Sequence, residues 1–149
     1  MKPTPPSWPR ISSALFYEDP AAAIAWLERA FGFKTRIRVD GPDGSIVHSE
    51  LEFGEGLIMV GAVERAERPD GRRVSPRGIA GRNTQSLMVY VDDVESHCER
   101  ARAEGATILQ EPETHDYGEE YWADRGYEAA DLEGHRWWFA ERLRTGGAR

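Results

Sequence analysis

The chain has 149 residues, 40% of them hydrophobic, which is enough for one globular domain with a substantial core. Its 26 acidic residues outnumber 19 basic ones, and the net charge of −7 disfavours nucleic-acid binding, which needs a basic surface. One cysteine excludes a disulfide framework, and the absence of a long apolar segment or secretory signal predicts a cytoplasmic protein that contacts no membrane.

The first half of the chain predicts one strand, one helix and three further strands. Residues 11–17 form a short apolar run typical of a strand. Asp19 and Pro20 are typical of a helix start, because Asp accepts hydrogen bonds from free N–H groups and Pro lacks a donor that would stay unpaired. Gly32 is a typical helix stop. The three later strands are predicted at residues 33–39, 46–53 and 57–63.

The second half predicts the same order of elements. Residues 84–91 form a strand, and Asp92 and Asp93 precede a helix that runs to residue 104. On that helix we expect Cys98 to face the core and His97 to be exposed among charged neighbours. The remaining strands are predicted at residues 106–110, 125–130 and 136–140, with a turn at residues 131–134 that we expect His135 to stabilise.

Residues 64–83 differ in composition from both halves. They are rich in arginine, namely Arg65, Arg68, Arg72, Arg73, Arg77 and Arg82. We interpret the segment as a solvated linker, and anion binding by these arginines is the alternative.

An internal repeat is the most informative feature. Five identical pairs lie 73 residues apart, and strand, cap, helix and stop coincide in both copies: Tyr17/Tyr90, Asp19/Asp92, Arg29/Arg102, Ala30/Ala103 and Gly32/Gly105. The sequence therefore predicts two βαβββ units, at about residues 11–63 and 84–140, that pack together because neither covers its own sheet.

Four motifs in order carry a resemblance to a known family: FYEDPAAAIAWLERAFGF at residues 16–33, VYVDDV at 89–94, AEGATI at 103–108 and DLEGHRWWF at 131–139. The chain resembles the vicinal oxygen chelate superfamily, in its glyoxalase/bleomycin-resistance branch, near the glyoxalase-like group found beside phosphonate genes. The resemblance implies an α+β fold, a single domain over residues 1–149 whose two units pair about a pseudo-two-fold axis to form a cupped mixed sheet. It also implies a homodimer.

Metal-using members of this superfamily place one ligand on each of four strands. The matching positions here are Ser12, Met59, Ser86 and Trp138. These side chains do not replace a His/Glu ligand set for a divalent ion. We therefore expect no metal and no other cofactor.

Two groups of residues are candidates for the site. On the strand at residues 46–53, period-2 alternation places His48, Glu50 and Glu52 on one face, either in a pocket or on a solvated surface. Acid–base chemistry by His48 and Glu50 is a possible role there. The second group is aromatic and concentrated near the end of the chain, with Trp138 predicted to point into the cup. The predicted ligand-binding residues are Phe16, His48, Glu50, Met59, Met88, Tyr90, Trp122, Arg136 and Trp138.

Two functions remain open. The first is a metal-free protein that binds a small aromatic or cationic organic molecule. Acidic residues such as Asp124 would favour a cation. The acidic segment 111–120, which includes His115, is a candidate lid. The second is a lyase, isomerase or dioxygenase that uses a relocated metal or the His48/Glu50 pair. A cup filled by its own side chains is the structural alternative.

Overall fold

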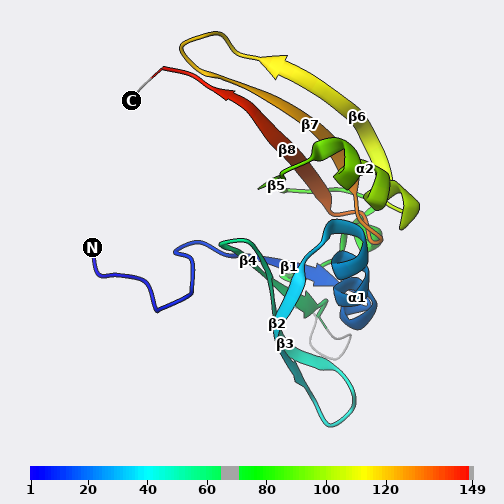
Figure 1. Cartoon of the computed structure of the whole chain (residues 1–149). Coiled ribbons are helices and arrows are strands. Elements are labelled where there is room, and N and C mark those ends of the chain that lie inside the picture. The colour runs from blue at the N-terminus through cyan, green and yellow to red at the C-terminus, as the bar shows by residue number, and fades with distance from the viewer. Residues whose placement is uncertain (65–70, 148–149) are drawn as a thin grey trace.

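A computed structural model describes residues 1–64 and 71–147 and shows two units of one design (Figure 1). The first unit comprises β1 (Ser13–Tyr17), α1 (Pro20–Phe31), β2 (Lys34–Asp40), β3 (Ile46–Phe53) and β4 (Gly56–Ala62). The second comprises β5 (Ser86–Tyr90), α2 (Val94–Ala103), β6 (Thr107–Asp116), β7 (Trp122–Ala130) and β8 (Arg136–Thr145). The predicted βαβββ repeat is therefore confirmed.

The two sheets have equivalent topologies. Their strand orders are β1-β4-β3-β2 and β5-β8-β7-β6. In each sheet the first strand is parallel to the fourth, while the other neighbours are antiparallel, so both sheets are mixed as expected for this α+β fold. Figure 1 shows the sheets spreading apart from the side of the molecule where α1 and α2 lie together.

Both helices begin at the predicted aspartates. The Asp19 carboxylate accepts a hydrogen bond from the Ala22 backbone N–H at 3.0 Å, and Asp93 accepts one from Ser96 at 3.0 Å. Gly32 ends α1 with φ +84°, a conformation that side chains with a Cβ rarely adopt. The two helix starts therefore follow from local sequence alone.

One aromatic core joins the two units. Phe31, the last residue of α1, lies 5.4 Å from Trp137 and 4.6 Å from Phe139 between ring centroids. Trp137 and Phe139 are fully buried on β8. The indole N–H of Trp26 also donates to the Glu104 carbonyl at 2.7 Å, across the same junction. Each unit thus covers the other's apolar face, which is the reason for pairing that the repeat predicted.

The predicted exposure of His97 is wrong. Its ring is half-buried at the junction of the units, 4.3 Å from the Phe139 ring. One nitrogen, Nε2, donates to the Phe31 carbonyl at 2.9 Å, and Nδ1 is 2.7 Å from the Tyr127 hydroxyl. Burial lowers the pKa of His97. The helical spacing of Val94, His97 and Ala101 places His97 on the buried face despite its charged neighbours.

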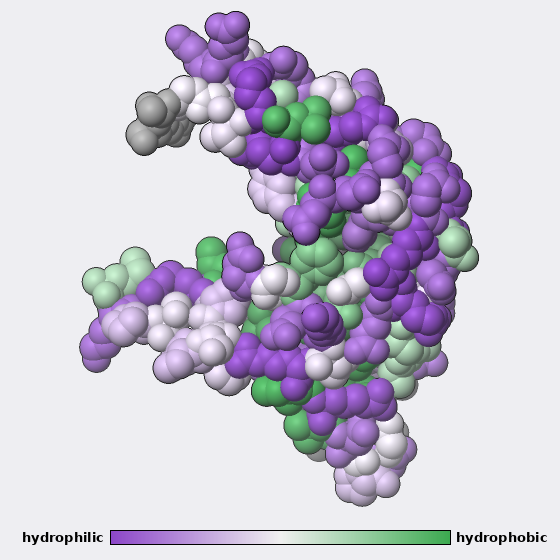
Figure 2. Space-filling model, viewed as in Figure 1, coloured by the Kyte–Doolittle hydropathy of each residue, from purple (hydrophilic) through white to green (hydrophobic). Residues whose placement is uncertain are grey.

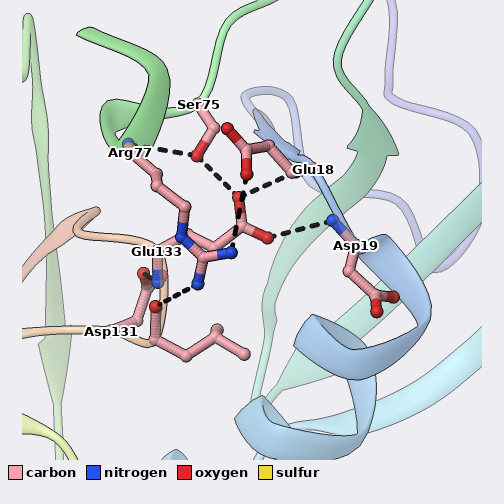
Figure 3. A network of polar contacts seen from close by, with 7 residues as sticks. Glu18, Asp19, Ser75, Arg77, Asp131 and Glu133 are labelled. Atoms are coloured by element: carbon pink, nitrogen blue, oxygen red, sulfur yellow. Dashed lines mark hydrogen bonds and ion pairs between the residues drawn. The ribbon is translucent and has the colours of Figure 1, made fainter.

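The turn before β8 reaches across to the first unit (Figure 3). Glu133 is only 3% exposed, and its carboxylate accepts from the backbone N–H groups of Glu18 at 2.7 Å and Asp19 at 3.0 Å. The Ser75 hydroxyl donates to the same carboxylate at 2.6 Å. Arg77 donates to the Leu132 carbonyl at 2.9 Å. The turn therefore fixes the start of α1 from a position 115 residues later.

Asp131 completes this junction. Its carboxylate accepts from the Tyr17 hydroxyl at 2.7 Å and from the Trp137 indole N–H at 3.1 Å. Burial and the neighbouring Asp131 charge raise the pKa of Tyr17 well above its usual value. His135 contributes to the turn through its backbone N–H, which donates a hydrogen bond to the Asp131 carboxylate at 3.0 Å. The His135 ring instead donates to the Phe16 carbonyl of the first unit at 2.8 Å, a role the sequence did not predict.

The predicted lid at residues 111–120 is wrong, because most of this segment, His115 included, belongs to β6. The acidic composition concealed the strand, and Pro112 lies in a region of shifted register with β7 that accommodates its missing N–H. Strands β7 and β8 also extend beyond the predicted limits, to Trp122 and Thr145 respectively.

The interpretation of residues 64–83 as a solvated linker needs correction. A short 3-10 helix, η1 (Pro76–Ile79), lies in this segment, and Ser75 and Pro76 are buried. Arg65 and Arg68 lie outside the described residues. Within the part of the chain that the structure describes, no helix is long and apolar enough to cross a bilayer.

Candidate functional site

The nine predicted ligand-binding residues lie on two separate sheets. We call the side of the first sheet that carries the first four the first face: Phe16, His48, Glu50 and Met59. We call the side of the second sheet that carries the other five the second face: Met88, Tyr90, Trp122, Arg136 and Trp138. No ladder joins the two sheets within the described residues, so the structure brings the nine together in two groups rather than one.

Glu50 is the buried charged group of the first face. It is 7% exposed and lies opposite Met59 in the ladder. One carboxylate oxygen is 3.0 Å from His48 Nε2, while Oε2 is buried with no hydrogen-bond partner. The hydrogen bond from His48 lowers the pKa of Glu50, although burial opposes this effect. Glu50 is therefore an ionised carboxylate with an unused acceptor atom.

The residues that cover Glu50 were not predicted. The Trp8 indole N–H points at Glu50 Oε1 at 3.4 Å, and the Arg36 guanidinium lies 3.8 Å from the centroid of the Trp8 ring. Arg36 Nε is 3.9 Å from Glu50 Oε2. A pocket of about 730 Å³ opens beside Trp8 and Arg36. The Pro-rich start of the chain thus folds over the first face, which strand periodicity gives no means of anticipating.

Trp138 dominates the second face. The alternation predicted for β8 is confirmed, since Trp137 is fully buried and Trp138 is half-buried. Trp138 pairs with Met88 on one neighbouring strand and with Glu128 on the other. A Cβ at Gly126 would come within 3.1 Å of the Trp138 ring, so the absence of a side chain there lets the indole lie close to the sheet.

A polar group that sequence reasoning missed extends the second face. Arg142 Nε donates to Asp124 Oδ1 at 2.5 Å, and its terminal nitrogen donates to the Tyr90 hydroxyl. The guanidinium carbon lies 5.0 Å from the Tyr90 ring centroid and 5.6 Å from that of Trp122. The Asp124 hydrogen bond raises the pKa of Arg142. The predicted strand ended at residue 140. A longer predicted strand would have placed Arg142 on the same face as Arg136 and Trp138, by the alternation of side chains.

His115 also lies next to this face. It is opposite Asp124 in the ladder, and its ring centroid is 6.1 Å from that of Trp138. Its Nε2 atom is buried and has no hydrogen-bond partner. The second face therefore combines aromatic rings with polar groups of both charges.

A hollow opens between the two units, and hydrophobic side chains form part of its inner wall (Figure 2). At this position the structure has a pocket of about 690 Å³, to which both units contribute. Its lining includes Phe53, Leu57, Ile58, Met88, Val89 and Trp137. Ile11, Met88 and Tyr90 are large apolar side chains of this wall that stay exposed, at 86%, 47% and 47%.

The four positions that the resemblance implies for metal ligands, Ser12, Met59, Ser86 and Trp138, carry no imidazole and no carboxylate. Met59 lies opposite Ala14 on the first sheet, and Trp138 lies opposite Met88 on the second. A thioether and an indole supply no anionic oxygen and no imidazole, so the donor chemistry is unsuitable. Within residues 1–64 and 71–147, no group of three or more His, Cys, Asp or Glu residues is arranged to hold a metal ion.

Two βαβββ units with one strand order and a shared helical junction define the paired-unit class of α+β proteins. Comparison with known proteins identifies the family. A match to the Glyoxalase/Bleomycin resistance protein/Dioxygenase superfamily spans residues 10–139. The chain belongs to this superfamily, as its resemblance predicted.

Individual relatives agree with this assignment. The crystal structure of TioX from Micromonospora sp. ML1 is 31% identical, with a TM-score of 0.66 and coverage of 95% of this chain and 98% of that one. A family enzyme from Burkholderia phytofirmans PsJN has the same TM-score at 20% identity, with coverage of 89% and 97%. The uncharacterized protein Mb0911c of Mycobacterium bovis is 29% identical over 136 residues, 91% of this chain and 85% of that protein.

Proposed function

We propose that this chain is a metal-free cytoplasmic protein that binds a small, flat organic molecule with aromatic or cationic character. The observation that carries the proposal is the half-buried indole of Trp138, held close to Gly126 at the position where metal-using relatives have a ligand. A ring in this position offers stacking in place of coordination. The acids Asp124 and Glu128 on the same face are each paired with an arginine, Arg142 and Arg136, so the proposal rests on the aromatic ring rather than on their charge.

Adjacent tryptophans provide the test. Proflavine, a planar aromatic cation, serves as the probe in a fluorescence titration. We expect Trp138→Ala to weaken proflavine binding by about 1–3 kcal/mol, as for an interface anchor. We expect Trp137→Ala, on the buried face, to lower the free energy of unfolding by about 3–5 kcal/mol, a larger loss than Trp138→Ala causes.

Trp8→Ala is the matched control, because Trp8 is an exposed tryptophan that lies over the other sheet, beside Glu50. It should leave proflavine affinity unchanged. A Trp138→Ala protein that loses stability yet keeps its full ligand-induced shift in melting temperature contradicts the proposal. In that case Trp138 fills the core and does not bind a ligand.

A homodimer is part of this proposal. The apolar wall of the hollow and the exposed Met88 support a second copy as its occupant. The edge strands β1 and β5 also offer backbone groups for pairing. Light scattering tests this: Met88→Glu should give monomers, whereas Val47→Glu, at an exposed valine outside the hollow, should not. An unmutated protein that is monomeric at all concentrations contradicts it.

The Glu50 oxygen that accepts no hydrogen bond, Oε2, favours a second candidate function, proton-transfer catalysis of the lyase or isomerase type. Glu50 is ionised, as a general base must be, and His48 lies within hydrogen-bond distance. Deuterium exchange into hydroxyacetone in D₂O, followed by NMR, tests for such a base. Exchange that Glu50→Gln abolishes supports catalysis, while equal rates with and without the protein reject it for this substrate type.

A further inference from the structure

A pocket of about 320 Å³ lies where β1, the segment that precedes β5, and the start of β8 meet. It borders the first face but is formed largely by residues 72–85, which the candidate site does not use. Its polar lining consists of Arg72, Arg82, Asn83, Thr84, Gln85, His135 and Arg136. Its apolar lining includes Phe16, Val74 and Ile79.

The charge of this pocket is opposite to that of the protein. Three guanidinium groups line it, and no carboxylate is among its described lining residues, although the chain carries a net charge of −7. Arg136 is paired with Glu128 at 2.7 Å. Arg82, in contrast, forms no ion pair with any residue that the structure describes. Arg82 thus places a guanidinium group without an ion pair to any described residue next to an apolar surface.

The pocket is held in shape by hydrogen bonds between distant parts of the chain. The Asn83 amide nitrogen donates to the Gly134 carbonyl at 2.9 Å, and its oxygen accepts from the Arg136 backbone N–H at 3.2 Å. The His135 ring fixes the opposite wall through the Phe16 carbonyl. Gln85 donates to the Ser13 hydroxyl at 2.8 Å. These contacts order the walls before any ligand binds.

We propose that this pocket is a binding site for a small organic oxyanion, a carboxylate or a phosphate monoester with an apolar body. The oxyanion would bind Arg82, since a guanidinium group forms paired charge-assisted hydrogen bonds with such groups. The apolar body would lie against Phe16 and Ile79. The site goes beyond the proposed function, because that function concerns an aromatic or cationic molecule stacked on Trp138.

Calorimetric titration with phenyl phosphate, benzoate and the neutral analogue benzamide tests the proposal. We expect phenyl phosphate or benzoate to bind and benzamide not to bind, and the stronger of the two identifies the oxyanion. Arg82→Gln should weaken the binding about tenfold or more. Arg38→Gln makes the same charge change at an exposed residue paired with Asp40 on β2, and should have no effect.

Two outcomes overturn the proposal. One is the absence of binding of both anions at millimolar concentration, and the other is an equal loss in Arg82→Gln and Arg38→Gln, which indicates a general charge effect. Trp138→Ala separates this site from the proposed function. It should leave phenyl phosphate affinity unchanged even if it abolishes proflavine binding, and phenyl phosphate should not displace proflavine.

Discussion

The His97 side chain of the second unit donates a hydrogen bond from Nε2 to the backbone carbonyl of Phe31, the last residue of α1, at 2.9 Å. This contact fixes the neutral tautomer, because the proton must lie on Nε2 and Nδ1 is left to accept from the Tyr127 hydroxyl. Burial lowers the pKa of His97, which favours this uncharged form of the imidazole between the two units.

We predict that the protein loses stability as the pH falls through the His97 titration. The folded-state pKa is lowered, so the unfolded chain, with a His pKa of about 6.5, binds more protons between the two values. Stability from this group is fully present above the unfolded pKa and declines below it until the folded pKa is reached. Urea unfolding between about pH 5.5 and 7.5 measures the decline.

His97→Gln removes the titrating group and should flatten this part of the pH profile. His115→Gln is the control, since His115 lies on β6 away from the unit junction and should leave the slope in place. An unchanged slope in His97→Gln assigns the pH dependence to other groups.

We expect Glu133→Gln to lower the free energy of unfolding by about 2–3 kcal/mol. The amide presents N–H where the carboxylate accepts from Glu18, Asp19 and Ser75, so at least one buried donor loses its partner. Chemical denaturation measures the loss. Glu111→Gln is the control: it breaks an exposed ion pair with Arg102 and should lower the free energy of unfolding by under about 1 kcal/mol. Equal losses in the two variants would contradict a stabilising role for the buried Glu133 carboxylate.

Trp8→Phe tests whether the start of the chain covers Glu50. The phenyl ring retains the apolar contact with Arg36 but lacks the indole N–H that helps to lower the Glu50 pKa. The Glu50 pKa should therefore rise. Carbon-detected NMR titration of the Glu50 carboxyl, assigned with Glu50→Gln, measures this pKa. Trp122→Phe, on the other sheet, is the control and should leave the Glu50 pKa unchanged. A Glu50 pKa that Trp8→Phe does not alter would show that the start of the chain does not cover Glu50.

The composition of the four family ligand positions predicts that protein purified without an affinity tag contains no stoichiometric zinc, nickel, iron or manganese. Plasma mass spectrometry measures this directly. Met59→His with Trp138→His provides a comparison in which two imidazoles are restored at these positions. One tightly bound ion per unmodified chain contradicts the prediction.

Much of the fold was predictable because local signals agreed with it. Asp19 and Asp93 cap the helices as their sequence context indicates, and alternation along β8 correctly separates Trp137 from Trp138. The longer strands were underestimated because charged residues continue the alternation of β6 and β8 beyond the apolar segments. Such strands need pairing partners, which a single sequence does not display.

The candidate site was less predictable because its contacts are not local. Trp8 reaches Glu50 from 42 positions away, and Arg142 meets Tyr90 from 52. No spacing rule relates such residues. The sequence indicated which residues share a strand face, as with His48 and Glu50, but not which distant side chains lie over each face.

The reach of Glu133 to Glu18 has a consequence for synthesis on the ribosome. At about 5–20 residues per second, a span of 115 residues takes roughly 6–23 s to translate. Throughout that time the first helix has emerged without the carboxylate that holds its start, and the aromatic ring of Phe31 has no second unit to cover it. The nascent first unit therefore depends on a late segment for its final packing. While the Phe31 side of this unit is exposed during translation, the chain is open to aggregation or to binding by a chaperone.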